Sequence, residues 1–117
     1  MTGLWYSAEY WSFTIGDETN DQYRINVDGY SGDSYRPDVL QDLYLGGKFY
    51  HDGMMFSTWD NDNDPSYDNC AQLYAGGWWY NSCAWVLVTS AQHFWWPFWP
   101  AGDVKVSASR MMIKTQQ

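Results

Sequence analysis

Hydrophobic and polar residues alternate in two short stretches of the chain, residues 23–28 and residues 104–109. Alternation with a period of two is typical of a β-strand that buries one of its faces. We therefore expect a half-buried strand in each stretch. Residues that turns prefer occur at the end of the first stretch, in Asp28-Gly29, and after it, in Ser31-Gly32-Asp33. We expect turns at both places.

The rest of the chain lacks such a regular period. Residues 60–69 show no apolar periodicity and contain Pro65, so we expect a loop there. Residues 38–45 follow one proline and precede two glycines, which favours a short helical turn. The rings of residues 78–80, Trp-Trp-Tyr, are expected to pack in a strand or at the edge of the core.

The composition favours an irregular, turn-rich fold over a helix bundle. Aromatic residues make up 21% of the 117 residues, including nine Trp and ten Tyr. Large rings of this kind bury apolar area, while their N–H and O–H groups still need partners. A polypeptide of this length forms at most one domain, with a modest core.

The chain is acidic, with 14 Asp and Glu against six Lys and Arg and a net charge of −8. This charge disfavours binding to nucleic acid. It has two interpretations that composition alone leaves open, a soluble surface or a cation site. His51 and His93 lack the spacing of a zinc site or a nucleophile motif, so we do not expect an enzyme, although composition does not exclude a paired-carboxylate hydrolase.

Residues 60–64, Asp-Asn-Asp-Asn-Asp, carry oxygen ligands at alternate positions, which suits Ca²⁺. An EF-hand does not fit, because Pro65 replaces the glycine at its sixth position and Ala71 replaces the glutamate at its twelfth. Cys70 and Cys83 also leave two alternatives. In a secreted protein they would pair and stabilise the fold by roughly 3 kcal/mol, and in the cytosol they would be buried thiols.

No secretory signal is recognisable at Met1-Thr2-Gly3, so we expect any export signal to come from a longer parent. The longest apolar run, residues 83–88, is far too short to span a membrane.

Several motifs together resemble the C-terminal part of a fibrinogen-related domain, as in ficolins, tachylectins, angiopoietins and the fibrinogen chains. They are FSTWDNDND at residues 56–64, NCA at 69–71 and GGWWYNSC at 76–83, in the family's spacing. Shorter matches lie in residues 10–34 and 96–115. The resemblance implies an α+β fold that is irregular and loop-rich, with mainly short antiparallel strands and few short helices. It also implies that residues 1–117 form a single partial domain, the C-terminal half, with residues 35–49 as an insertion.

The resemblance implies a calcium site and a disulfide. By position, Asp62 and Asp64 would supply carboxylates, and Ser66 and Asp68 would supply backbone carbonyls, while Asp60 would be a nearby charge. The family joins the cysteines that correspond to Cys70 and Cys83. It acts outside cells, so we expect a secreted protein.

Sugar-binding members of the family hold acetyl groups beside the calcium loop. The corresponding residues here are Tyr74, a pocket tyrosine, and Ser82 and Cys83, whose peptide bond is cis in the family. Two departures weaken this match, because Ala84 replaces the usual histidine and the segment 84–95 is shorter than in relatives.

The sequence therefore predicts a secreted, calcium-dependent, lectin-like module that binds acetylated carbohydrate or a microbial surface ligand in innate defence. The alternative is a protein–protein interaction module of the angiopoietin or fibrinogen type, without a sugar site. Self-association is left open. Residues 94–100 are most simply packing, although an exposed stacking platform or a membrane-interface wedge would have the same composition.

Overall fold

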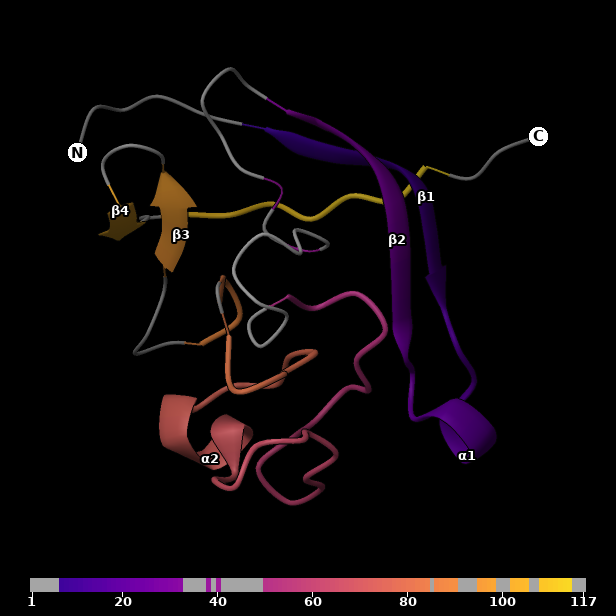
Figure 1. Cartoon of the computed structure of the whole chain (residues 1–117), viewed down its shortest axis with the longest axis vertical. Coiled ribbons are helices and arrows are strands. Elements are labelled where there is room, and N and C mark those ends of the chain that lie inside the picture. The colour runs from indigo at the N-terminus through magenta and orange to yellow at the C-terminus, as the bar shows by residue number, and fades with distance from the viewer. Residues whose placement is uncertain are drawn as a thin grey trace.

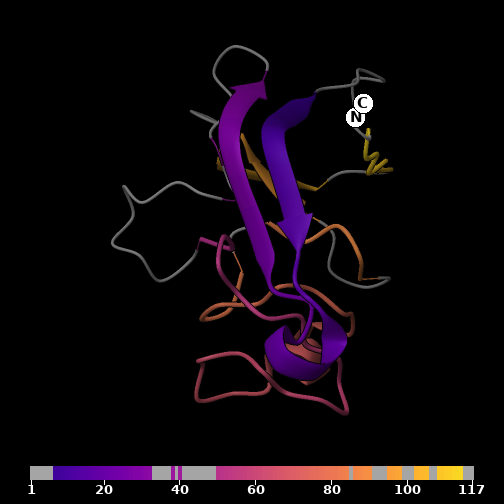
Figure 2. The same ribbon diagram turned by 90° about the vertical axis from the view of Figure 1, so that its right-hand side faces the viewer.

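A long antiparallel hairpin forms one side of the protein (Figures 1 and 2). The computed structural model describes residues 7–32, 38, 40, 50–84, 86–90, 95–98, 102–105 and 108–114. Strand β1, Ala8–Ile15, pairs with β2, Ile25–Gly32, and Tyr10 faces Tyr30 across the ladder. The start of β2 lies beside the segment that leads to the acidic loop. The N–H of Ile25 donates to the carbonyl of Met54 in that segment at 3.0 Å.

A single turn of helix, α1 at Glu18–Asp21, closes the hairpin. Asp17 caps it by accepting the N–H of Asn20 at 2.8 Å. Gln22 and Tyr23 then adopt left-handed backbone angles, with φ of 46° and 57°. The prediction that the strand begins at Tyr23 is therefore wrong, because the backbone is still reversing direction there and pairing begins at Ile25.

The turn expected at Asp28-Gly29 is also absent, since both residues lie inside β2. Gly29 is nevertheless in a conformation that favours glycine, with φ of +72°. A Cβ at Gly29 would lie 2.8 Å from the Cβ of Trp11 on the facing strand. Pairing with β1 thus overrides the local turn preference, and glycine is needed for close approach of the two strands.

The core lies between β2 and the aromatic residues that the sequence placed in a strand or at the core edge. Trp78, Trp79 and Tyr80 are buried, as are Ile25 and Val27. The core position is confirmed, but the backbone forms only an isolated bridge between Ser57 and Trp78 rather than a strand. Irregular backbone carries the largest side chains, so aromatic packing rather than a sheet holds this region together.

A second helix, α2 at Cys70–Tyr74, follows the acidic loop and was not predicted. Asn69 caps it by accepting the N–H of Gln72 at 3.1 Å. It ends at Ala75, which has a left-handed φ of 58°. The predicted loop at residues 60–69 is confirmed, since it contains no helix or strand.

A second hairpin joins β3, Trp95–Phe98, to β4, Gly102–Lys105. The predicted C-terminal strand is correct in part, because pairing starts at Gly102, and Ala108 and Ser109 lie outside any strand. The side chains of residues 94–100 lie outside the described residues, as do residues 39 and 41–45 of the helical turn expected at 38–45. The expectation of an irregular α+β fold with short antiparallel strands and short helices is confirmed.

His51 links two parts of the core. It is fully buried, its Nδ1 lies 2.8 Å from the carbonyl oxygen of Trp79, and its Nε2 lies 3.4 Å from the backbone nitrogen of Val86. A neutral ring satisfies both contacts when Nδ1 donates and Nε2 accepts. Burial lowers the pKa of His51 to about 4.

Acid should therefore destabilise the fold through His51. Between the ordinary pKa of 6.5 and the folded value of about 4, the unfolded protein binds the proton more readily, so stability is fully present above this range and is lost as the pH falls through it. The loss by pH 4 should be on the order of 3 kcal/mol, at about 1.4 kcal/mol for each tenfold change in proton affinity. Urea unfolding of wild type and His51→Gln across this range measures it.

The Gln variant should show a shallower pH dependence than wild type between pH 6.5 and 4. Equal pH dependence in wild type and His51→Gln would contradict this role for His51.

Candidate functional site

Hydrogen bonds to Phe56 and the buried Ser57 hold the start of the acidic loop in place. The hydroxyl of Ser57, which is buried, accepts the N–H of Asn63 at 2.9 Å. The side-chain amide of Asn63 donates to the backbone carbonyl of Phe56 at 2.9 Å. These two bonds hold the base of the loop, so the residues that follow start from a fixed position.

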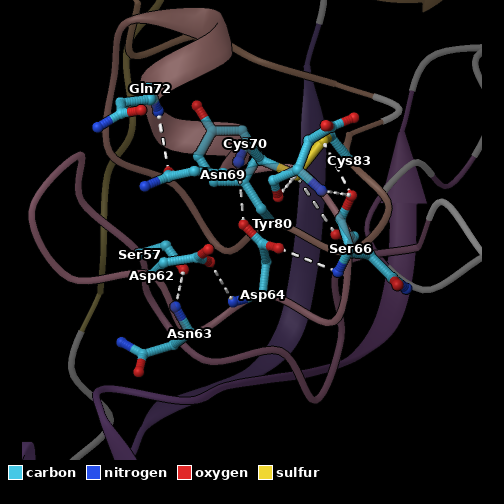
Figure 3. The surroundings of a disulfide bond; sticks show 12 residues. Ser57, Asp62, Asn63, Asp64, Ser66, Asn69, Cys70, Gln72, Tyr80 and Cys83 are labelled. Atoms are coloured by element: carbon cyan, nitrogen blue, oxygen red, sulfur yellow. Dashed lines mark hydrogen bonds between the residues drawn. A yellow bond between two sulfur atoms is a disulfide. The ribbon is translucent and has the colours of Figure 1, made fainter.

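Three consecutive side-chain turns then coil the loop (Figure 3). Asp62 accepts the N–H of Asp64 at 3.2 Å, Asp64 accepts that of Ser66 at 3.0 Å, and Ser66 accepts that of Asp68 at 3.2 Å. Each bond runs from a backbone nitrogen to a side-chain oxygen two residues earlier, the pattern of Asx and Ser/Thr turns. The four residues expected to bind calcium therefore belong to one continuous coil.

The carboxylate of Asp64 joins this coil to helix α2. Its second oxygen accepts the N–H of Cys70, the first residue of the helix, at 3.1 Å. Burial and contact with the Asp62 carboxyl raise the pKa of Asp64 to about 6. Two carboxyl groups in contact repel one another when both are ionised. Residues 49–104 contain no Lys or Arg, and the cation that lines a hollow with Asp64 is Arg24, from the β1–β2 hairpin.

The donors present in the coil fit a hard cation. All are oxygens, from carboxylates and backbone carbonyls, which calcium prefers. Among the described residues, no three His, Cys, Asp or Glu side chains gather as a metal cluster. The set predicted from the sequence needs only two carboxylates, those of Asp62 and Asp64, and a divalent ion there would offset their repulsion.

The expected disulfide is present between Cys70 and Cys83, whose Cα atoms lie 5.6 Å apart. It connects the first residue of α2 to the end of the buried aromatic segment. The peptide bond between Ser82 and Cys83 is cis, as the resemblance implied. Figure 3 shows the disulfide beside Ser66, whose hydroxyl lies 3.9 Å from the sulfur of Cys83.

Of the three residues expected to form an acetyl pocket, Ser82 and Cys83 lie at this disulfide, and Tyr74 is the last residue of the helix that begins at Cys70. Tyr74 is half-buried and its ring stacks on that of Tyr80, with centroids 6.5 Å apart. Ser82 and Cys83 are half-buried too. Two hollows on the described surface, with volumes of about 440 and 360 Å³, are lined by other residues. Residues 91–94 and 99–101, which follow these three in the sequence, lie outside the described residues.

The larger hollow lies elsewhere, between Trp59 and helix α2, with a volume of about 440 Å³. The smaller, of about 360 Å³, lies between Arg24, Met54 and Asp64. The sequence reasoning missed both. A signal for the first was present, since Trp59 interrupts a polar loop and the small residues Ala71, Ala75, Gly76 and Gly77 recur behind it.

The sequence matches the family described as fibrinogen beta and gamma chains, C-terminal globular domain, over residues 1–116. It is 46% identical over 76 residues to angiopoietin-related protein 7 of Bos taurus, covering 65% of this chain and 19% of that protein. It is 41% identical over 88 residues to the fibrinogen gamma chain of Mus musculus, covering 66% and 19%. The sequence thus spans about a fifth of the length of these relatives.

Solved structures show the same similarity. The fibrinogen-like globe domain of human ANGPTL6 matches with a TM-score of 0.56 and 36% identity, over 69% of this chain and 32% of that one. Lamprey fibrin D-dimer, in complex with the peptide Gly-His-Arg-Pro-amide, matches with a TM-score of 0.59 and 31% identity, over 68% and 26%. No helix in the described residues has the length and apolar character needed to cross a membrane.

Removal of the disulfide should lower the free energy of unfolding. A cross-link between residues 13 apart restricts the unfolded protein, so replacing both Cys70 and Cys83 by alanine should cost about 3 kcal/mol. Urea unfolding of the oxidised wild type and the double variant measures the difference. Reductant should lower the stability of wild type but not of the variant, and equal stability of the two oxidised proteins would refute this contribution.

Proposed function

Because the protein belongs to the family of C-terminal globular domains of the fibrinogen beta and gamma chains, a family of non-enzymatic binding modules, we propose that it is a secreted, calcium-dependent recognition module. The resemblance seen in the sequence and the fold class it implied are thereby confirmed. The relatives are secreted proteins, and a disulfide is typical of proteins in oxidising compartments. Both support secretion of this protein.

The calcium site is the part of the proposal that geometry supports best. The observation that carries it is the three-turn coil, with Asp62 and Asp64 in contact and Asp64 fastened to Cys70. Asp62 and Asp64 would hold the ion through carboxylate oxygens, and Ser66 and Asp68 through carbonyl oxygens. The bound ion would supply positive charge that stabilises the coil.

Substitution of Asp62 by asparagine should weaken calcium binding at least about tenfold, from an affinity of roughly 10⁻⁴–10⁻³ M, because a charged ligand is lost. Isothermal titration measures it. Asp60→Asn is the matched control, since Asp60 accepts the Thr58 hydroxyl at 2.7 Å and lies outside the coil. Equal calcium affinity in Asp62→Asn and Asp60→Asn would remove the proposed site.

We propose acetylated carbohydrate, or another microbial surface ligand, as the primary ligand, in a setting of innate defence. Tyr74, Ser82 and Cys83 would bind it. Support comes from the family positions of these residues and from the disulfide, which joins Cys83 to the helix that carries Tyr74 and lies next to Ser66 of the coil.

The second candidate is a protein–protein interaction module on the same scaffold. Ala84 favours it, because this half-buried residue replaces the histidine usual in the family and so removes a hydrogen-bond donor. The relatives favour it too, since they include angiopoietin-related protein 7 and a fibrin bound to a peptide.

A glycan array separates the two candidates. In millimolar calcium, the protein should bind acetylated sugars, and EDTA should abolish the signal, because the calcium coil holds the neighbouring binding residues in place. Ala84→His, which restores a donor, should strengthen binding.

Matched sugars without the acetyl group serve as the control for specificity. Binding of Gly-His-Arg-Pro-amide without any response to acetylated sugars, in wild type and in Ala84→His alike, would favour the protein-interaction module and reject the lectin-like one.

A further inference from the structure

The hollow between Trp59 and α2 is a surface that neither the calcium coil nor the disulfide corner uses. Its volume of about 440 Å³ is enough for one or two side chains of a ligand. Thr58 and Trp59 form one wall, and Ala71, Gln72 and Ala75 form the other. Tyr74, the α2 residue assigned to the acetyl ligand, does not line it.

The floor of the hollow is kept open by small residues that the packing behind it requires. A Cβ at Gly76 would lie 3.0 Å from the Cα of Ser90, and one at Gly77 would lie 3.0 Å from the Phe56 ring. Larger residues therefore do not fit at these positions without movement of the core. The two glycines add no side chain to the hollow, and its lining is mostly apolar.

Trp59 is presented to solvent by a tight turn. Thr58 and Asn61 exchange backbone hydrogen bonds of 3.1 and 3.0 Å across it, and the carbonyl of Trp59 accepts the Asn69 amide at 3.2 Å. The side chain is 67% exposed. A large ring that is exposed on a fixed backbone and borders an apolar hollow is a feature of binding surfaces.

The charge around the hollow identifies the kind of ligand. The exposed Asp60 follows Trp59 directly, and Asp62, Asp64 and Asp68 follow along the acidic loop, where Asp64 lines the smaller hollow together with Arg24. Calcium in the coil would offset only two of these four negative charges. The surface therefore attracts cations, and a tryptophan face binds Lys and Arg side chains through cation–π contact.

We propose that this hollow binds a lysine or arginine residue from an extended segment of a partner protein. The alkyl stem of such a residue matches the apolar wall of Ala71 and Ala75, and its charged head reaches Trp59 and Asp60. The site is separate from the acetyl-ligand residues and does not depend on the calcium or sugar proposals.

A matched pair of peptides tests the site. Gly-Gly-Arg-Gly-Gly-amide and Gly-Gly-Gln-Gly-Gly-amide share a free amino group and differ only in the central side chain. NMR titration of the whole protein should show that the Arg peptide shifts the indole N–H signal of Trp59 and binds more tightly than the Gln peptide, and that salt weakens its binding.

Trp59→Leu should weaken binding of the Arg peptide by about three- to tenfold, the range of a cation–π contact. Asp60→Asn should weaken it as well. Trp11→Leu is the matched control, because Trp11 is 81% exposed on β1, and it should bind as wild type does. Circular dichroism and thermal melts verify that each variant is folded.

Equal binding of the two peptides, no binding of either at millimolar concentration, or an unchanged affinity in Trp59→Leu would each overturn the proposal. A shift of the Trp59 signal by methyl glucoside and not by the Arg peptide would overturn it in favour of a sugar site. Repeating the titration in calcium and in EDTA separates this result from failure of the calcium proposal.

Discussion

The carboxylate of Asp64 is the contact on which the acidic region depends. One of its oxygens holds the N–H of Ser66 within the coil, and the other holds the N–H of Cys70 at the start of α2. Cys70 is in turn bonded to Cys83 at the end of the buried aromatic segment. The Asp64 carboxylate thus couples a solvent-facing loop to a part of the core that contains the disulfide. Displacement of this carboxylate would break both of its hydrogen bonds.

The hairpin and the acidic region are joined by hydrogen bonds to backbone carbonyls of the hairpin, and they do not share a sheet among the described residues. The N–H of Phe56 donates to the carbonyl of Gln22 at 2.9 Å, and the indole of Trp79 donates to the carbonyl of Tyr23 at 2.9 Å. Gln22 and Tyr23, the two residues with left-handed backbone angles at the end of the hairpin turn, therefore supply the carbonyls that accept these hydrogen bonds. In Figures 1 and 2, α1, α2 and the acidic loop lie at the same end of the hairpin. The recognition surfaces proposed at that end share this support.

Sequence reasoning predicted the acidic loop and the disulfide better than it predicted the strands and turns. The spacing of Asp62, Cys70 and Cys83 in family motifs predicted the loop and the disulfide, because both depend on residues close together in the sequence. Tyr23 and Gly29 were misplaced, because their conformations depend on the path of the backbone around α1 and on Trp11 across the ladder. Such contacts between distant residues leave no periodic pattern. The hollow beside Trp59 was missed for the same reason, since its floor depends on Ser90 and Phe56.

The absence of Lys and Arg from residues 49–104 also bears on how proteases cleave the protein. Proteases of trypsin specificity cleave after these two residues, so within this region they find no site between Lys48 and Lys105. The fragment left by complete digestion would contain the acidic coil, the cross-linked cysteines and the surface around Trp59 on one uninterrupted peptide. A trypsin-like protease that removed the β1–β2 hairpin would leave the proposed binding surfaces on one covalently intact fragment.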